Sequence, residues 1–124
     1  MTKRASGTAA LREIVLQLPG AEDATTQRGI AFKVRGRLIV CAAIHSSAEP
    51  GSVVVRVSAE QRARLMAAYP EALYLPDHYA KHPSVLARLA RLDREALRDI
   101  LGAAWLFVTE NAERPKRRRS PRKR

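Results

Sequence analysis

Apolar residues recur at helical spacing near the start of this 124-residue chain. They stand at i, i+3, i+4 and i+7, and they are Leu11, Ile14, Val15 and Leu18. This spacing predicts an amphipathic helix from a capping Thr8 to Leu18. Pro19 and Gly20 would end that helix, and residues 1–7 are expected to be a flexible leader.

A longer stripe of the same kind follows Asp93, whose side chain is suited to cap a helix. Its members keep the helical period from i to i+11, and they are Leu97, Ile100, Leu101, Ala104, Trp105 and Val108. A stripe of this kind packs on a core, so we expect Trp105 to be a packing residue. Leu106 and Phe107 fall off the stripe and would cover another part of a sheet or contact a dimer partner.

Alternating and continuous apolar runs replace helical spacing between residues 30 and 57. Residues 30–35 alternate between apolar positions and small or basic ones, which predicts a half-buried strand. Gly36 permits a tight reversal into residues 37–44, an aliphatic run that indicates a more deeply buried partner strand. Residues 52–57 predict a third strand, whereas the polar residues 21–29 are expected to be a connection.

The next helix is marked by a capping box. Ser58 and Gln61 have the required S-x-x-Q spacing, and the helix should run to about Tyr69, before Pro70. Two further strands are expected, one at residues 72–75 and one at residues 85–89. They would form a second hairpin with the polar segment 77–82 at its tip.

Four stretches of this sequence resemble the MmcQ/YjbR family. They are Leu18-Pro19-Gly20-Ala21-Glu22, Phe32 to Leu38, Pro76 to Leu89, and Asp93 to Trp105, which are similar to the family's LPG.E opening, its F+V.GK.F hairpin, its tPHY…yP.VLvrL segment and its D.EEL.ELL..AW close. Together they span about residues 8–112, nearly the whole globular part of the chain.

The resemblance implies a small α/β (α+β) domain at residues 8–112. Its antiparallel sheet would carry two β-hairpin wings packed by about three helices, in the order α-β-β-β-α-β-β-α. The resemblance also implies a DNA-binding role, which for this family is inferred from shape. Residues 113–124 would follow the domain as a disordered basic tail.

Charge is distributed unevenly along the chain. The sequence has 23 Lys and Arg against 12 Asp and Glu, but residues 1–113 contain 15 of the basic residues and all 12 acids, a net of only +3. The remaining cations have no acid among them, and they are Arg114, Lys116, Arg117, Arg118, Arg119, Arg122, Lys123 and Arg124. Such a segment favours sequence-independent contact with phosphates. It would serve equally well for solubility or for docking to an acidic protein.

The first hairpin brings three cations together in the sequence. Lys33 and Arg35 are expected to share a strand face opposite Phe32 and Val34, and Arg37 would lie just across the turn. A tip of this kind can straddle phosphates or enter a DNA groove. The alternative is a solvated hairpin edge, where Lys and Arg protect the sheet from aggregation.

The second tip contains His78, Lys81 and His82. If this segment were helical, the two histidines would share a face and could hold a metal, but no acidic or third ligand stands at a suitable spacing. A polar loop whose Lys81 and imidazoles approach phosphate is favoured over a metal site. A loop with no binding role is the other interpretation.

No sequence motif indicates catalysis or a cofactor. The chain lacks a nucleophile elbow, a Walker loop and a G-x-G-x-x-G turn. Its one cysteine, Cys41, cannot form an internal disulfide and is expected to be a buried structural thiol in a reducing cytoplasm. No apolar run is long enough for a membrane span. Arg-rich and Ala-rich usage is typical of a GC-rich bacterial genome.

These patterns together predict a non-catalytic, cytoplasmic DNA-binding protein without metal or cofactor. The hairpin cations and the basic tail would contact duplex DNA, largely without sequence preference. The sequence leaves the oligomeric state open and favours a monomer. The alternative function is a protein-interaction or adaptor module whose basic tail serves solubility or docking.

Overall fold

The computed structural model describes residues 2–113, and it describes side chains for residues 7–110. The strands are β1 (Ala21–Asp23), β2 (Ala31–Val34), β3 (Arg37–Ala42), β4 (Ser52–Arg56), β5 (Leu73–Tyr74) and β6 (Ser84–Arg88). The helices are α1 (Thr2–Leu16), α2 (Ala59–Ala68), α3 (Asp77–Ala80) and α4 (Arg94–Glu113), and a 3₁₀ turn, η1 (Leu89–Arg91), precedes α4.

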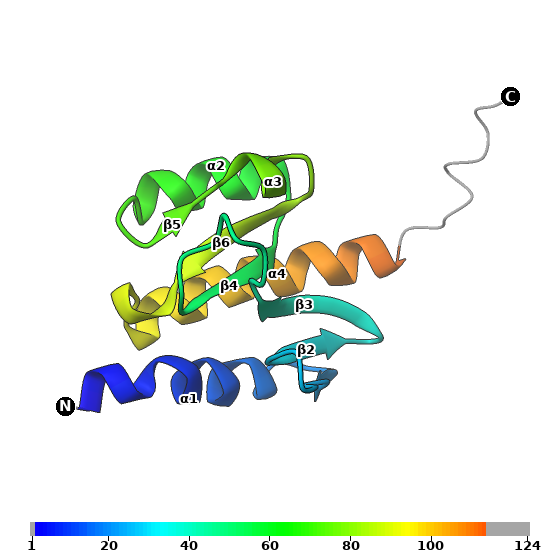
Figure 1. Ribbon diagram of the computed structural model, residues 1–124. Coiled ribbons are helices and arrows are strands. Elements are labelled where there is room, and N and C mark those ends of the chain that lie inside the picture. Colours follow the sequence, from blue (N-terminus) through cyan, green and yellow to red (C-terminus); the bar gives the residue numbers. More distant parts are fainter. Residues whose placement is uncertain (1, 114–124) are drawn as a thin grey trace, which may run out of the picture.

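The six strands form one antiparallel sheet in the order β1-β2-β3-β4-β6-β5 (Figure 1). The α+β class and the antiparallel sheet predicted from the sequence are therefore confirmed. The order of elements differs from the prediction in two places, because β1 and α3 fall in segments that were expected to be loops. Both are short and polar, so neither has an apolar period long enough to be recognised.

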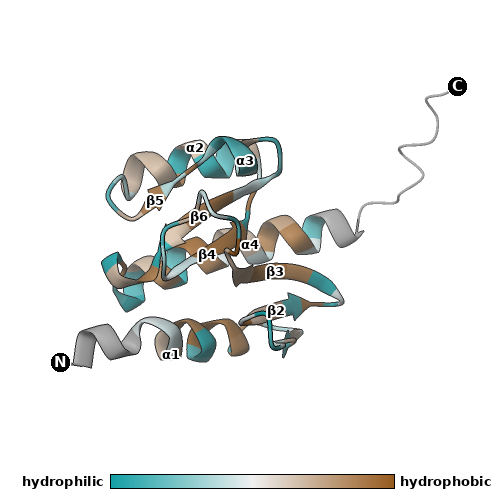
Figure 2. Ribbon diagram, viewed as in Figure 1, coloured by the Kyte–Doolittle hydropathy of each residue, from teal (hydrophilic) through white to brown (hydrophobic). Residues whose placement is uncertain are grey.

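One face of the sheet carries the main hydrophobic core. Val53 and Val55 of β4 and Val57 just after it alternate toward this face, and all three are buried in the core to which α1 and α4 also contribute. Leu65 of α2 belongs to the same core, so α2 covers the β5–β6 end of this face. Figure 2 shows the apolar character of β3, β4 and α4 where they meet.

A β-bulge adds a residue to this core. Phe32 pairs with Val40, but the next residue, Lys33, pairs with Leu38, so Ile39 has no partner in β2. A bulge lets two consecutive residues turn to the same side of a strand. Ile39 and Val40 are both fully buried as a result.

The local signals in the sequence explain most element boundaries. The β2–β3 turn consists of Arg35 at φ 53° and Gly36 at φ 82°, the positive values of a tight hairpin reversal. Ser58 and Gln61 form the reciprocal bonds of the predicted capping box. The Asp93 carboxylate accepts a bond from the Ala96 amide at 2.8 Å and caps α4.

The N-terminal helix begins earlier than the sequence predicted. It starts at Thr2, so residues 2–7, expected to be a flexible leader, are helical. The prediction was wrong because Thr8 was interpreted as a cap, although nothing in residues 2–7 forbids a helix as a proline would. Thr8 instead lies inside α1.

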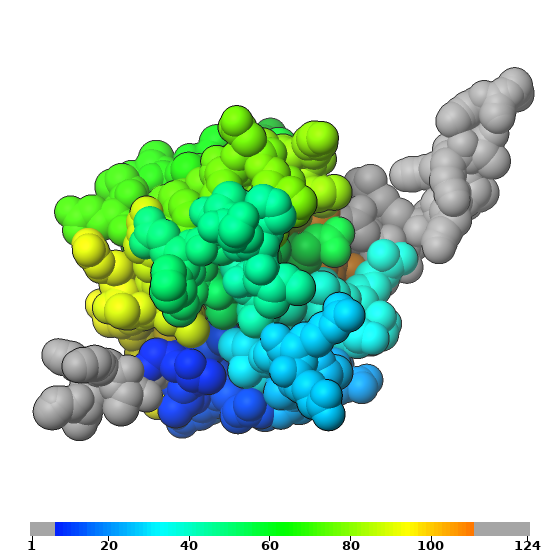
Figure 3. Space-filling model, viewed as in Figure 1, coloured from blue at the N-terminus to red at the C-terminus, as the bar shows by residue number. Residues whose placement is uncertain are grey.

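The opposite face of the sheet, called here the open face, is covered only in part. The connection 43–51 crosses it over β4 and β6, held by Tyr74, whose hydroxyl lies 2.6 Å from Ser52 Oγ and accepts a bond from the Glu49 amide. The Arg88 guanidinium donates two hydrogen bonds of 2.8 Å to the Glu49 carboxylate. Figure 3 shows this face, with the connection in green between the hairpin in cyan and α3 in yellow-green.

Candidate functional site

The β2–β3 hairpin presents cations on both of its faces. Lys33 is exposed and pairs with Leu38, so both side chains belong to the open face. Arg37 pairs with the core residue Val34 and therefore lies on the helix-covered side. The tip of the hairpin is basic on each side of its ribbon.

Arg35 does not share a strand face with Lys33, which corrects the expectation from the sequence. β2 ends at Val34, and Arg35 occupies the turn. Its guanidinium carbon lies 5.9 Å from the centroid of the Trp105 ring, so the side chain folds back toward α4. The alternation that places Lys33 does not extend into the turn. Trp105 also donates from Nε1 to the Pro19 carbonyl at 2.8 Å and packs against the core, in agreement with the role predicted for it.

The second hairpin forms as predicted, but its connection is not a free tip. β5 and β6 pair antiparallel through Leu73–Ala87 and Tyr74–Leu86. The one-turn helix α3 then folds over the open face, where the Tyr79 hydroxyl accepts a bond from the His45 amide at 3.2 Å. The His78 ring stacks on the His45 ring, with centroids 3.5 Å apart and planes 10° from parallel. Lys81 and His82 follow and are exposed.

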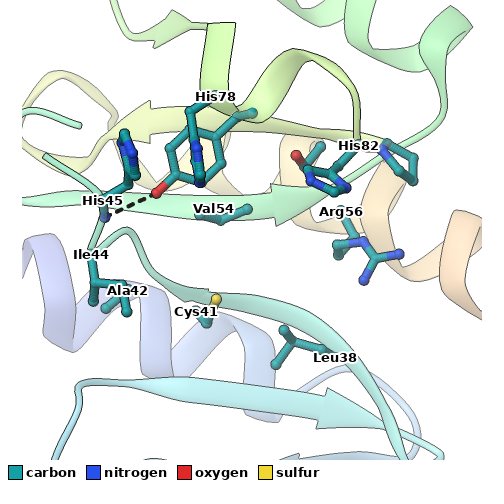
Figure 4. A pocket seen from close by; sticks show the side chains of 12 residues that line it. Leu38, Cys41, Ala42, Ile44, His45, Val54, Arg56, His78 and His82 are labelled. Atoms are coloured by element: carbon teal, nitrogen blue, oxygen red, sulfur yellow. Dashed lines mark hydrogen bonds between the residues drawn. The ribbon is translucent and has the colours of Figure 1, made fainter. Parts of the chain in front are cut away.

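A groove of about 640 Å³ lies on the open face between β3 and α3 (Figure 4). Its lining is Leu38, Cys41, Ala42, Ile44, His45, Val54, Arg56, His78, Tyr79, His82, Pro83 and Ser84. Most of these side chains are apolar, but all three histidines of the chain are among them. The paired segment of β3 and β4 ends at Val40 and Val55. The Arg56 guanidinium lies at this end of the groove, near Leu38 (Figure 4).

Two polar atoms in the groove are buried and have no hydrogen-bond partner among the described residues: Arg56 Nε and Ser84 Oγ. The two residues are directly paired between β4 and β6, so their side chains are neighbours on the open face. Ser84 is only 1% exposed. Buried polar groups are normally satisfied, so two neighbouring orphans in one groove indicate a place where a polar ligand atom fits.

The electrostatic environment of the groove disfavours additional positive charge. Desolvation, reinforced by His45, His82 and Lys81, lowers the pKa of His78. Burial raises the pKa of the Cys41 thiol, which Arg56 partly opposes. Cys41 is half-buried at the groove and not fully enclosed, so the prediction of a buried structural thiol is only partly correct.

Ion pairs divide the cations into two sets. Among the side chains that the structure describes, four arginines reach a carboxylate: Arg12 with Asp23, Arg64 with Asp99, Arg88 with Glu49, and Arg94 with Glu13. Within the described part of the chain, none of these pairs involves Lys33, Arg37, Arg56 or Lys81. These four cations lie on the hairpin, in the groove and beside α3, whereas Arg28, Arg91 and Arg98, which have no such pair among the described residues either, lie elsewhere on the surface.

Several other features bear on the predicted sites. No group of three or more His, Cys, Asp or Glu side chains among the described residues is arranged to hold a metal ion. None of the helices described here has the length and apolarity needed to span a membrane. The predicted tail contacts lie outside the described residues, and they are Arg114, Lys116, Arg117, Arg118, Arg119, Arg122, Lys123 and Arg124.

Comparison with known proteins establishes the family of this chain. A family model described as YjbR matches residues 16–107. The chain belongs to the YjbR family. The fold of this YjbR-family chain is also similar to the crystal structure of Deinococcus radiodurans protein DR2400, which has a DUF419 domain. The TM-score is 0.65 at 22% identity, over 90% of this chain and 85% of the other. No curated protein matches this YjbR-family chain significantly.

The sequence predicted the cations at the two hairpins but not the groove. His45, Arg56 and Ser84 come from three separate segments, and no local spacing links them. One signal was available: in the run 52–57, Arg56 alternates with three valines and must point away from the face that they bury.

Proposed function

We propose that this YjbR-family protein is a non-catalytic DNA-binding protein that contacts phosphates through its β2–β3 hairpin and Lys81. The observation that supports this proposal is the partition of charge. Lys33, Arg37 and Lys81 have no ion-pair partner among the described residues, whereas Arg12, Arg88 and Arg94 are held by carboxylates. Cations that are free of carboxylates remain available to phosphates.

The shape of the hairpin supports a role at a groove of DNA. A two-stranded ribbon fits the major groove of B-DNA, and this ribbon carries Lys33 on one face and Arg37 on the other. Glu22 lies opposite Lys33 in the β1–β2 pairing. Its carboxylate would repel a phosphate bound at Lys33 and so lower the affinity for DNA. The interaction is expected to be directed mainly at phosphates, which position a protein on DNA without specifying sequence.

The basic C-terminal segment would add affinity that depends strongly on salt. If all eight cations of residues 114–124 met phosphates, their part of the slope of log K against log salt would approach about −7. The hairpin and Lys81 would add a smaller part. The two contributions can therefore be separated experimentally.

Fluorescence anisotropy with a labelled DNA duplex over a salt series tests the proposal. The proteins are the full chain, a chain ending at residue 113, and the full chain with Lys33, Arg37 and Lys81 changed to Ala. A control with Arg28, Arg91 and Arg98 changed to Ala removes the same charge from exposed positions in the β1–β2 connection, on η1 and on α4. We expect the hairpin variant to bind more weakly than the control and to lose up to about three units of salt slope.

Equal binding by the hairpin variant and the control would reject the hairpin interface. If the chain ending at residue 113 also failed to bind at low salt, only the basic segment would remain as a source of affinity. Failure of the full chain would favour the alternative, a protein-interaction module. Ile44 is 69% exposed on the open face and is the observation that favours a protein partner.

A further inference from the structure

The groove on the open face has the dimensions and composition of a small-molecule site. Its volume of about 640 Å³ lies within the usual range for ligand pockets, roughly 300–1,000 Å³. Such pockets are mainly apolar and contain a few polar groups that orient the ligand. Leu38, Val54 and Pro83 belong to the apolar part, and Arg56 and Ser84 supply polar groups.

Arg56 and Ser84 form a preformed but unused donor pair. Arg56 Nε and Ser84 Oγ are both buried, and neither has a partner among the described residues. Directly paired residues on antiparallel strands have Cβ atoms roughly 5 Å apart, so a single anionic group could reach both side chains. An arginine fork binds a planar carboxylate through two parallel bonds, and a hydroxyl can donate a third.

The surroundings hold this donor pair in place. Arg62 donates from Nη1 to the carbonyls of His82 and Ser84, each at 3.0 Å. These bonds fix the chain where it leaves α3 and enters β6. Ser84 therefore occupies a rigid position on a strand and not on a free loop, as a preorganised site requires.

The far part of the groove is suited to an apolar or aromatic body. The stacked rings of His45 and His78 lie there, and the Tyr79 ring meets the His78 ring edge to face at a centroid distance of 4.9 Å. Val54 and Ile44 complete this part of the lining. Positive potential from the Arg56 guanidinium favours an acid over a neutral or basic molecule.

We propose that this groove binds a small organic acid, with its carboxylate on Arg56 and Ser84 and its apolar or aromatic body between β3 and α3. The site shares no side chain with the DNA contacts proposed above, because Lys33, Arg37 and Lys81 do not line it, although Leu38 and His82 next to them do. The proposal therefore goes beyond DNA binding and does not depend on it.

Cys41 provides a built-in reporter for the test. It is the only cysteine in the chain, and it lines the groove. The full-length protein is treated with iodoacetamide at about pH 8. Benzoate is present as the acid probe, and benzamide serves as a neutral probe with the same ring. Amide chemical shifts of Arg56 and Ser84 are followed in a parallel titration.

Benzoate is expected to slow Cys41 alkylation and to shift both amides in a saturable way, with Kd of the order of 1 mM for so small a probe. Benzamide should do neither at equal concentration. Arg56→Gln and Ser84→Ala should each weaken benzoate binding about tenfold, as the loss of a bond to a charged group predicts. Arg98→Gln, which removes a charge from exposed α4, should leave it unchanged.

Protection by benzamide equal to that by benzoate would overturn the carboxylate site, and so would protection that survives in Arg56→Gln. Inorganic phosphate that protected as well as benzoate would show that the ring is not recognised and would overturn the proposal. If phenyl phosphate protected Cys41 and benzoate did not, the proposal that the site recognises a carboxylate would be rejected. DNA binding measured on the same variants should be unaffected, which separates this outcome from the fate of the proposed function.

Discussion

The two faces of the sheet use the same strands in opposite ways. Along β4 and β6, Val53, Val55, Val85 and Ala87 point into a dry core, while the residues between them point to the open face. The core face is closed by α1, α2 and α4, but the open face has only the connection 43–51 and one turn of helix above it. The stability of the fold therefore comes mainly from the core face, and the open face is available for binding a ligand.

The polar atoms show the difference most clearly. On the helix-covered side, the buried Thr109 donates its hydroxyl to the Trp105 carbonyl at 2.7 Å. On the open face, Arg56 Nε and Ser84 Oγ are buried, and no described residue offers them a hydrogen bond. Such a local cost is typical of functional surfaces and uncommon in a packing interface.

The largest effect that separates the two faces should come from truncating a leucine on each. Leu101 is fully buried in the core, so Leu101→Ala should reduce the free energy of unfolding by about 2–5 kcal/mol. Leu38 is half-buried at the groove, and Leu38→Ala should cost less than about 1.5 kcal/mol. Urea denaturation measures both, and equal losses would remove the distinction between the faces.

A smaller loss is expected when the connection over the open face is released. Arg88 bonds Glu49 twice and the Glu71 carbonyl once at 3.0 Å, and its guanidinium carbon lies 4.1 Å from the centroid of the Tyr74 ring. Arg88→Gln should speed amide exchange at Ser52, whose N–H donates to the Glu49 carbonyl, while the α4 amides remain protected. Arg98→Gln is the charge-matched control. Unchanged exchange at Ser52 would show that Arg88 does not hold this connection.

A modest pH effect should distinguish the open face from the uncharged core. The folded protein lowers the pKa of His78 below its ordinary value of 6.5, with His45, His82 and Lys81 nearby and the Asp77 carboxylate adjacent in sequence. The unfolded chain therefore takes up the proton first, and stability should fall as the pH decreases from about 7 through 6.5 to the lowered pKa of folded His78. The melting temperature of His78→Gln should decline less over this range than that of the unaltered protein. Parallel declines would contradict the assignment.

The smallest effect on stability is expected at Ser84. Its hydroxyl is buried and unpartnered, so Ser84→Ala removes no hydrogen bond and should change the free energy of unfolding by no more than about 0.5 kcal/mol, or raise it. Thermal denaturation provides the measurement. A decrease of more than about 2 kcal/mol in the free energy of unfolding would show that the Ser84 hydroxyl stabilises the fold, which would contradict its role as a ligand-binding group.

The sequence was most informative where one local pattern determined the structure. The stripe of α4, the Ser58–Gln61 capping box and the Gly36 turn each required only neighbouring residues, and each prediction is confirmed. Short polar elements were missed: β1 is an edge strand of three residues, Ala-Glu-Asp, with no hydrophobic alternation. α3 is a single turn after Pro76.

The candidate site shows the same limit more strongly. Alternation predicted the exposed position of Lys33, but Arg35 left its expected face because the backbone turns there. The groove depends on which strands pair and on where α3 folds back. No spacing in the sequence brings His45, Arg56 and Ser84 together, because tertiary structure alone makes them neighbours.

The central claim is that the β2–β3 hairpin and Lys81 form the DNA-binding surface. Amide chemical-shift mapping of the full-length protein, titrated with a DNA duplex at low salt, tests it most directly. The account predicts that shifts within residues 2–113 concentrate at residues 33–37 and 78–82 and spare α1 and α4. Shifts confined to residues 114–124, or spread over α1 and α4, would contradict it.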